Sequence, residues 1–250
     1  MSINRIPQKC FVIIPVYNEQ YHLAKILKDL SSIENIEILI VNDHSTDNSV
    51  MIASNHKVNC IDNFCGKGRD GAILTGLNYY LKQQPKEWIV IFDADGQHPT
   101  DFLNHITEES ANFLYKGNRF SKLSKQFNTP PDRLFLAKEL EQLIRLKFRI
   151  VIKDPNCGLL GIPHHCLCWI KANCNFDKHV SLDICIRLLC QFSQKMFLKE
   201  IPIPALYLQD SARHKINYDP KNVVARHSER RLSLLAKLVS LENEIIQHDL

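Results

Sequence analysis

Two carboxylates stand two residues apart at the end of an apolar stretch, in the segment Ile91-Phe-Asp-Ala-Asp-Gly-Gln-His-Pro99. Residues 88–92 are all apolar and predict a buried strand, in which alternate side chains project from one face. Asp93 and Asp95 are therefore expected to converge on one hard cation at the carboxyl end of this strand, with Gln97 as a neutral oxygen ligand. Such ligands suit Mg²⁺ or Mn²⁺ shared with the phosphates of a substrate.

The residues that follow the carboxylates predict the turn that positions them. Gly96 permits a sharp change of direction, and Pro99, Thr100 and Asp101 are typical of a first helical turn, where a capping oxygen and an acid are favoured. Taken alone, an Asp-x-Asp pattern also fits a solvated acidic loop. The strand before it and the helix after it favour the metal site.

Two further apolar strands, residues 10–16 and 36–41, also end in polar turns. Ligands bind outside the carboxyl ends of the strands in open parallel α/β sheets, so the turn residues should line one crevice with Asp93. These turn residues are Asn18, Glu19 and Asp43. A helix between the two strands is predicted by apolar residues at helical spacing, namely Leu23, Ile26, Leu27 and Leu30.

Seven segments between residues 9 and 207 resemble, in order, the motifs of the family 2 glycosyltransferases with the GT-A fold, in particular the polyprenyl-phosphate (dolichyl-phosphate-type) hexosyltransferases. An ordered series of motifs is more specific than any one of them. The segments are Ile14-Pro-Val-Tyr-Asn-Glu19, Val41-Asn-Asp-His-Ser-Thr-Asp47, Gly66-Lys-Gly68 through Gly76, Asp93-Ala-Asp-Gly-Gln-His-Pro99, Gly117-Asn-Arg-Phe120, Asp154-Pro-Asn-Cys-Gly158 and Glu200-Ile-Pro-Ile203.

The resemblance implies a Rossmann-like, mostly parallel α/β sheet flanked by helices. Residues 1–207 would form this GT-A domain, with a nucleotide-binding half to about residue 100 and an acceptor-facing half after it. Residues 208–250 are expected to form a C-terminal helical extension, because Pro220 precedes apolar residues at helical spacing. This stripe of Leu234, Leu238, Leu241 and Ile245 fits packing on the same domain, which we favour, a homodimer seam or a membrane-surface element.

The resemblance also assigns roles around the donor, a UDP- or GDP-hexose. Pro15, Tyr17 and Glu19 of the first motif would line its site, and Asp43 would contact the nucleobase or ribose. Asp43 also fits a helix cap, although Ser45 or Asp47 could perform that task. The metal on the donor diphosphate would be held by Asp93, Asp95 and Gln97, with Asp95 required for catalysis.

Several cations are expected to contact phosphate. Arg119 and Arg133 match arginines of the lipid-phosphate branch, and a planar guanidinium suits phosphate geometrically, although both also fit ordinary surface arginines. The chain departs from the family pattern at Ala137, where relatives often carry a small hydroxyl residue. It departs again at His214-Lys215, where relatives commonly carry Ser-Lys, although Lys215 can still neutralise a phosphate.

The resemblance implies transfer of the hexosyl group with inversion at the anomeric carbon. A polyprenyl phosphate is the favoured acceptor, because it is already ionised, whereas a hydroxyl acceptor needs a positioned base. Asp154 and Asp183 are the candidate bases, and Asp183 also fits an ordinary exposed acid on a helix. A glycan hydroxyl acceptor and a non-catalytic nucleotide-sugar-binding module stay open as alternatives. A sugar nucleotidyltransferase fits less well, because the first strand lacks a glycine-rich triphosphate loop.

Positive charge is concentrated in residues 116–153, which contain ten lysines or arginines against three acidic residues. Apolar residues at helical spacing make part of this segment an amphipathic basic helix: Leu134, Leu136, Leu140, Leu143, Ile144 and Phe148. It fits a core-facing helix with a solvated face or a surface that meets anionic lipid heads. Nucleic-acid binding is not favoured, because aromatic residues are not interleaved with the basic ones.

Length and composition agree with one enzyme domain, since 250 residues with 45% hydrophobic residues can bury a full core. No stretch approaches the roughly 20 apolar residues that cross a bilayer, and no signal peptide precedes the first strand. The protein is therefore expected to be cytoplasmic, with peripheral membrane contact left open. The nine cysteines are expected to be reduced and mostly buried as small apolar residues. His164-His165-Cys166-Leu-Cys168 lacks the second ligand pair of a zinc site.

Overall fold

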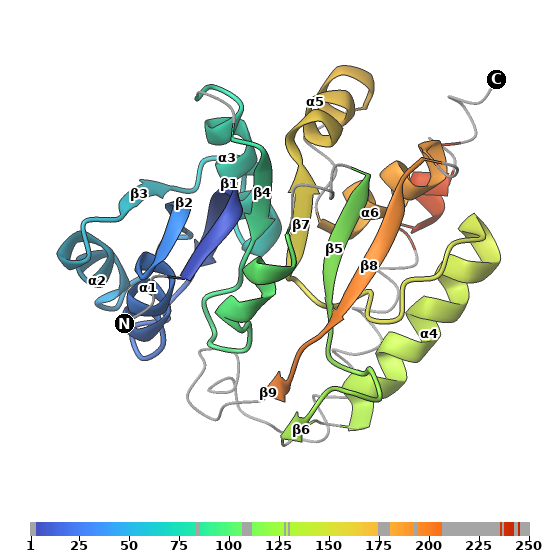
Figure 1. Ribbon diagram of the computed structural model, residues 1–250, viewed down its shortest axis with the longest axis horizontal. Helices are drawn as coiled ribbons and strands as arrows, with labels where there is room; N and C mark the ends of the chain where they lie inside the picture. The colour runs from blue at the N-terminus through green and yellow to red at the C-terminus, as the bar shows by residue number, and fades with distance from the viewer. Residues whose placement is uncertain are drawn as a thin grey trace.

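The computed structural model describes residues 4–83, 86–106, 112–127, 129, 131–174, 181–192, 195–206, 236, 238–242 and 245. Seven strands form one sheet in the order β3-β2-β1-β4-β7-β5-β8, and β6 pairs with β9 in a separate ladder (Figure 1). The strands are β1 (Asn4–Val16), β2 (Ile33–Asn42), β3 (Asn59–Asp62), β4 (Trp88–Ile91), β5 (Phe113–Asn118), β6 (Gln126–Phe127), β7 (Leu160–Pro163), β8 (Phe197–Pro202) and β9 (Ala205–Leu206).

The sheet is mostly parallel, which confirms the predicted class. β1 runs parallel to β2 and β4, β2 to β3, and β5 to β8. β7 alone runs antiparallel to its neighbours β4 and β5. Six of the seven strands therefore point the same way, and their carboxyl ends share one edge of the sheet.

Helices cover both faces of this sheet (Figure 1). They are α1 (Leu23–Ser31), α2 (Ser49–Asn55), α3 (Arg69–Tyr80), the 3₁₀ helix η1 (Thr100–His105), α4 (Pro131–Phe148), α5 (His164–Asn173) and α6 (Ser181–Gln191). Successive side chains of β1 point to opposite faces of the sheet and enter two apolar clusters. Phe11 and Ile13 pack in one cluster with residues of α3. Val12 and Ile14 pack in the other with residues of α1.

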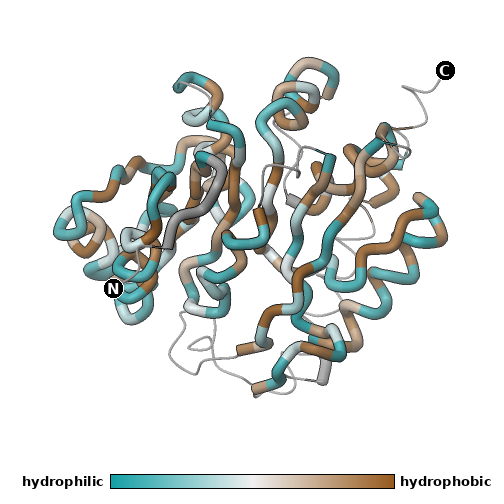
Figure 2. The backbone as a smooth tube through the Cα atoms, viewed as in Figure 1, coloured by the Kyte–Doolittle hydropathy of each residue, from teal (hydrophilic) through white to brown (hydrophobic). Residues whose placement is uncertain are grey.

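The predicted amphipathic helices form with most of the expected apolar residues inward, although Leu134 of α4 is 37% exposed. In α1 the buried residues are the four predicted ones, Leu23, Ile26, Leu27 and Leu30. In α4 Leu136, Leu140 and Ile144 are buried at a spacing of four, whereas Leu146 is 79% exposed. Figure 2 shows this as alternating brown and teal along α4. The core-facing interpretation of the basic helix is thus confirmed for these residues.

Two local expectations need correction. The helix after the carboxylates is η1, a 3₁₀ helix, and the residue before it is Pro99, so the predicted side-chain cap is absent there. β4 ends at Ile91, so Asp93 and Asp95 lie in the turn beyond the strand. Side-chain alternation along a strand therefore does not decide how the two carboxylates point.

The described part of the C-terminal segment packs on the main core. Leu238 and Leu241 are each 2% exposed within one of the two apolar clusters, and Ile245 packs against the same cluster. The Lys147 ammonium pairs with the Glu242 carboxylate across the contact with α4. The favoured packing interpretation is confirmed for these residues. Pro220 and Leu234 lie outside the described residues, and the boundary at residue 207 stays a prediction. None of the helices within the described ranges is long and apolar enough to cross a membrane.

Candidate active site

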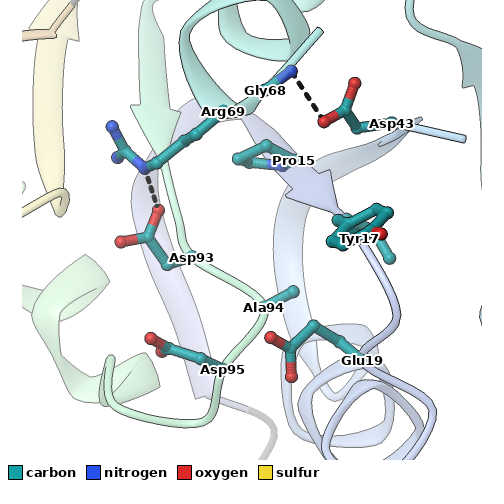
Figure 3. A pocket seen from close by; sticks show the side chains of 10 residues that line it. Pro15, Tyr17, Glu19, Asp43, Gly68, Arg69, Asp93, Ala94 and Asp95 are labelled. Carbon is teal, nitrogen blue, oxygen red and sulfur yellow. Dashed lines mark hydrogen bonds and ion pairs between the residues drawn. The ribbon is translucent and has the colours of Figure 1, made fainter. Parts of the chain in front are cut away.

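A cavity of about 250 Å³ opens at the edge where the parallel strands end (Figure 3). Its lining combines residues from the ends of β1 and β2, the start of α3 and the turn after β4. They are Pro15, Val16, Tyr17, Glu19, Asp43, Gly68, Arg69, Asp93, Ala94 and Asp95. The predicted crevice is confirmed for Glu19, Asp43 and Asp93.

Asn18 is not part of this lining and instead ties two turns together. It has a φ of 54°, and its side-chain oxygen accepts the Thr46 N–H at 2.8 Å. The Asn18 N–H donates to the Ser45 hydroxyl at 3.1 Å. These bonds join the turn after β1 to the turn after β2, so the two walls of the cavity are held at a fixed spacing.

Asp47, and not Asp43, serves the start of α2. One Asp47 oxygen accepts the Ser49 N–H at 2.9 Å and the other accepts the Gln20 N–H at 3.0 Å. The bond from Ser49 satisfies a backbone donor of the first turn, which has no partner within the helix. Asn48, the N-cap residue of α2, makes no side-chain capping bond, so Asp47 serves the first turn from one position earlier, and the Asp43 carboxylate bonds elsewhere.

Asp43 bridges the loop after β3 and the start of α3. Its Oδ1 accepts the Asn63 side-chain amide and its Oδ2 accepts the Gly68 N–H, both at 2.8 Å. Gly68 has a φ of +97°, a conformation that favours glycine. The Asp43 side chain is 12% exposed and remains on the cavity wall. It fixes the position of α3 while presenting a carboxylate to the cavity.

Two side chains hold Asp93, the Arg69 guanidinium and the His98 imidazole. Its Oδ1 accepts a hydrogen bond from Arg69 Nε at 2.7 Å. The buried His98 accepts the Asp93 N–H through Nδ1 at 2.9 Å, and its Nε2 lies 3.6 Å from Asp93 Oδ2. Burial lowers the pKa of His98, against the opposing effect of the Asp93 charge. The neutral ring thus carries its proton on Nε2, on the side of the Asp93 carboxylate.

Asp95 is the less engaged of the two carboxylates. The residue is 8% exposed, and its Oδ1 accepts the Gln97 N–H at 3.1 Å. Gln97 thus supports Asp95 through its backbone, and its side chain is not among the groups that line the cavity. Gly96, with a φ of +76°, makes the predicted sharp turn between them. Figure 3 shows Asp93, Asp95 and Glu19 around the same opening.

The donor set fits a hard divalent cation that is shared with a substrate. Carboxylate oxygens of Asp95, Asp93 and Glu19 line the opening. Within the described ranges, no three His, Cys, Asp or Glu side chains are grouped closely enough to hold a metal by themselves. Mg²⁺ and Mn²⁺ commonly use one or two protein carboxylates and take their other ligands from water and phosphate. The oxygen chemistry of this wall agrees with that pattern.

Arg69 is a cavity residue that sequence reasoning missed. Besides its bond to Asp93, its Nη2 donates to the Gly158 carbonyl at 3.3 Å. A Cβ atom at Gly158 would clash with Arg69 Nη2 and Asp93 Oδ2, so a larger residue here would displace this ion pair. The available signal was its place directly after Gly66-Lys-Gly68, at the first residue of a helix that starts at the crevice.

The Asp154-Pro-Asn-Cys-Gly158 motif is a buried scaffold. The fully buried Asp154 accepts Arg119 Nε at 2.8 Å and Arg119 Nη2 at 2.9 Å. Glu200 accepts the N–H groups of Lys153 and Asp154 at 2.9 and 3.2 Å, and its burial raises the pKa of its carboxyl. The buried Lys116 ammonium donates to the Cys157 carbonyl.

Asp154 therefore cannot be the general base, and that expectation is wrong. Both of its oxygens are bound by Arg119, and no part of the residue reaches solvent. The loop instead fixes Arg119 at one end and contacts Arg69 through Gly158 at the other. Two arginines are thus positioned by five consecutive residues.

The remaining predicted residues are placed only in part. Arg133 is partly buried in the first turn of α4, and Arg119 is 12% exposed, but neither lines the cavity. Ala137 is 1% exposed and packs in the core, so the position where a hydroxyl was expected faces inward in this chain. Asp183 belongs to α6, but its side chain lies outside the described structure, as do His214 and Lys215.

Comparisons with known proteins agree with this arrangement. Residues 11–169 match the family model described as glycosyl transferase family 2. A dolichol-phosphate mannosyltransferase of Pyrococcus furiosus is 28% identical over 165 residues, which cover 62% of this chain and 46% of that enzyme. A UDP-N-acetylglucosamine–dolichyl-phosphate N-acetylglucosaminyltransferase of Methanococcus voltae is 24% identical over 228 residues, 83% of this chain and 89% of that protein.

The fold is shared with a solved glycosyltransferase. Glucosyl-3-phosphoglycerate synthase from Mycobacterium tuberculosis, in complex with Mn²⁺, uridine diphosphate and phosphoglyceric acid, superposes with a TM-score of 0.66 at 13% identity. The superposition covers 94% of this chain and 78% of that one. The family model spans well over half of the chain and the strand order places the motifs at one edge, so this chain belongs to glycosyl transferase family 2 and is a glycosyltransferase with the GT-A fold.

Proposed function

We propose that the chain transfers a hexosyl group from a UDP- or GDP-sugar to a polyprenyl phosphate, with inversion at the anomeric carbon and with a divalent cation on the donor. The observation that carries this proposal is the cavity itself. It gathers Asp43, Arg69, Asp93 and Asp95 at the carboxyl ends of parallel strands. This edge is where α/β sheets bind nucleotides.

The donor would lie along the cavity from Asp43 to Asp95. Asp43 would contact the nucleoside, and Pro15, Tyr17 and Glu19 would line the wall beside it. Asp95, with Asp93 beside it, would hold Mg²⁺ or Mn²⁺ on the diphosphate, and Gln97 would support Asp95 through its backbone N–H. A bound cation stabilises the negative charge that develops on the departing diphosphate. Uridine diphosphate and Mn²⁺ in the structurally similar synthase support this part of the proposal.

The choice of acceptor rests on proton chemistry. A hydroxyl acceptor must lose a proton during attack, whereas a phosphate monoester is already ionised at neutral pH and needs cations. Asp154, one of two candidate bases, is sealed inside the core. Arg119, Arg133 and Lys215 would supply positive charge to a phosphate. The lipid-phosphate acceptors in the names of the two relatives support the same choice.

We also propose peripheral contact with an anionic membrane through an apolar rim, defined as Leu123, Phe127 and Phe135. Their exposed fractions are 81%, 49% and 58%. The rim spans the loop after β5, strand β6 and the first two turns of α4, at the edge where the parallel strands end (Figure 1). The exposed Lys122 and Lys125 lie in the same loop. Apolar side chains beside lysines suit the boundary between lipid tails and anionic heads.

Substitution of the proposed metal ligand tests the chemistry. Asp95→Asn should reduce sugar transfer at least about 100-fold, because charge stabilisation at the leaving group is lost. It should also weaken Mn²⁺-dependent donor binding in calorimetric titrations while leaving the melting temperature nearly unchanged. Asp101→Asn, which alters an exposed acid of η1, is the matched control. Full transfer by Asp95→Asn, or by the unaltered enzyme in excess EDTA, would refute the metal assignment.

Alanine substitutions of Asp43 and Asp47 form a matched pair that distinguishes nucleotide binding from helix capping. Asp43→Ala should lower the affinity for UDP or GDP at least about tenfold, equivalent to about 1.4 kcal/mol. Asp47→Ala should lower the free energy of unfolding by about 1 kcal/mol through loss of the helix cap, with unchanged nucleotide affinity. Nucleotide titration and chemical denaturation of both variants measure the two effects. Equal nucleotide affinities in both variants would leave Asp43 with a structural role only.

Parallel acceptor assays test the lipid phosphate. With a short-chain polyprenyl phosphate, Arg133→Ala should raise the acceptor KM roughly tenfold, as expected for one lost charge-assisted contact. Lys138→Ala, an exposed cation farther along α4, should have no effect, and Asp183→Asn should stay active. Transfer to oligosaccharides alone, lost in Asp183→Asn, would favour a hydroxyl acceptor. Donor binding without transfer to any acceptor would indicate a non-catalytic binding module.

Vesicle sedimentation tests the rim. Binding to phosphatidylserine-containing vesicles should fall several-fold when Leu123 and Phe135 are both replaced by aspartate. Less apolar area would then enter the membrane, and the net positive charge of the rim would decrease. Leu146→Asp alters an equally exposed leucine near the other end of α4 and should leave binding unchanged. Equal binding of the three proteins, or no binding by the unaltered chain, would remove the membrane contact from the proposal.

A further inference from the structure

Cys168 differs from the other cysteines of the chain. All nine cysteines are free thiols within the described residues, and Cys168 is the one whose side chain is exposed. It lies in α5, which follows the antiparallel strand β7. That strand ends at the edge opposite the donor cavity, where Pro163 pairs with Trp88 at the start of β4 (Figure 1). Cys168 is therefore remote from the chemistry described above.

Two further side chains connect Cys168 to the core in a hydrogen-bonded series. Its Sγ lies 3.2 Å from Nε2 of His164, one helical turn earlier. The other ring nitrogen of His164, Nδ1, lies 2.7 Å from the Tyr80 hydroxyl. Tyr80 is 1% exposed, and its hydroxyl donates to the Lys86 carbonyl at 2.8 Å. The series joins residues from α3, α5 and the loop before β4.

This network assigns the tautomer of His164. A carbonyl oxygen can only accept, so the single phenolic proton of Tyr80 is directed to Lys86. The Tyr80 oxygen must then accept from His164, which places the ring proton on Nδ1. Nε2 is left with a lone pair that faces the Cys168 sulfur. The contact is therefore a thiol that donates to an imidazole.

The protonation states of both partners agree with this assignment. Burial raises the pKa of Tyr80, which keeps its donor proton in place at neutral pH. Burial and the neighbouring His165 lower the pKa of His164. The imidazole is thus neutral near pH 7 and able to accept a proton. A nucleophile, a base within hydrogen-bond reach and a third group that orients the base are the parts of an activated nucleophile.

We propose that Cys168 is the reactive thiol of this chain and a site of mixed-disulfide formation with low-molecular-weight disulfides. The Cys168 sulfur attacks one sulfur of the incoming disulfide as its proton moves to His164 Nε2. A new S–S bond forms, the original S–S bond breaks, and the departing thiolate takes the proton from His164. One disulfide and one thiol are consumed, and one disulfide and one thiol are produced, so no other oxidant is needed.

The same helical turn contains an internal contrast. Cys166 lies 3.4 Å from Nε2 of His165, but it is 1% exposed, and burial raises the pKa of its thiol to about 12. Cys60, which is half-buried, also has its pKa raised by burial. Cys166 has an imidazole nearby but is not accessible to a reagent, and Cys60 is partly accessible but has a raised pKa. Neither combination gives a reactive thiol. Cys168 alone among the nine combines exposure with an oriented base.

The test uses the full-length protein with oxidised glutathione at pH 7 and reads the modification of each cysteine by peptide mass spectrometry. Cys168 should react at least about tenfold faster in the native protein than in the urea-unfolded chain, a modest part of what a positioned base usually contributes. His164→Gln should remove this advantage, and Tyr80→Phe should reduce it, because the ring loses its orienting partner. His165→Gln is the matched control and should not slow the reaction, because loss of a neighbour that lowers the pKa of His164 cannot weaken this base.

Circular dichroism melts show whether each variant is folded, and alkylation with iodoacetamide gives a second measure of the same sulfur. In the urea-unfolded state Cys168 should react at the same rate in all variants. A difference seen only in the native state then comes from the folded position of His164 and not from the reagent. A native Cys168 that reacts no faster than the unfolded chain would overturn the proposal. Equal slowing by His164→Gln and His165→Gln would also overturn it, because helix perturbation would then explain the rate.

Discussion

The shared direction of the parallel strands is the constraint on which the rest of the structure depends. β1, β2 and β4 are neighbours in the sheet and end at one edge, so the turns that follow them meet there. Hydrogen bonds between the turns, such as Thr46 to Asn18, then set their spacing. The direction of the strands brings the turns together, and the side chains of these turns then give the cavity its chemistry.

Electrostatic pairing divides the acidic residues of this edge into different roles. Asp93 is paired with Arg69 and Asp154 with Arg119, whereas Asp95 accepts a hydrogen bond from the Gln97 N–H. Removal of one member of a buried ion pair typically costs about 3–5 kcal/mol, because the other charge stays buried. The Asp154–Gly158 loop contacts both arginines, so it couples the packing of the core to the charge around the cavity.

The two edges of the sheet carry different chemistry. Hard oxygen ligands and arginines gather where the parallel strands end, and the Cys168, His164 and Tyr80 series lies at the opposite edge. The single antiparallel strand β7 makes this separation possible, because it carries the chain away from the cavity edge to α5. A modification at Cys168 could thus affect the donor site only through the sheet that lies between them.

The sequence by itself determined the α/β class, the buried face of α1 and the kinds of group that gather at the strand ends, because periodicity and turn residues are local properties. It also singled out Asp95, Asp43 and the Asp154–Gly158 motif. Tertiary structure decided their partners. Arg69 bonds to Asp93 from 24 positions away, Arg119 to Asp154 from 35, and Tyr80 to His164 from 84. Such pairs depend on which strands become neighbours, and no local pattern specifies that order.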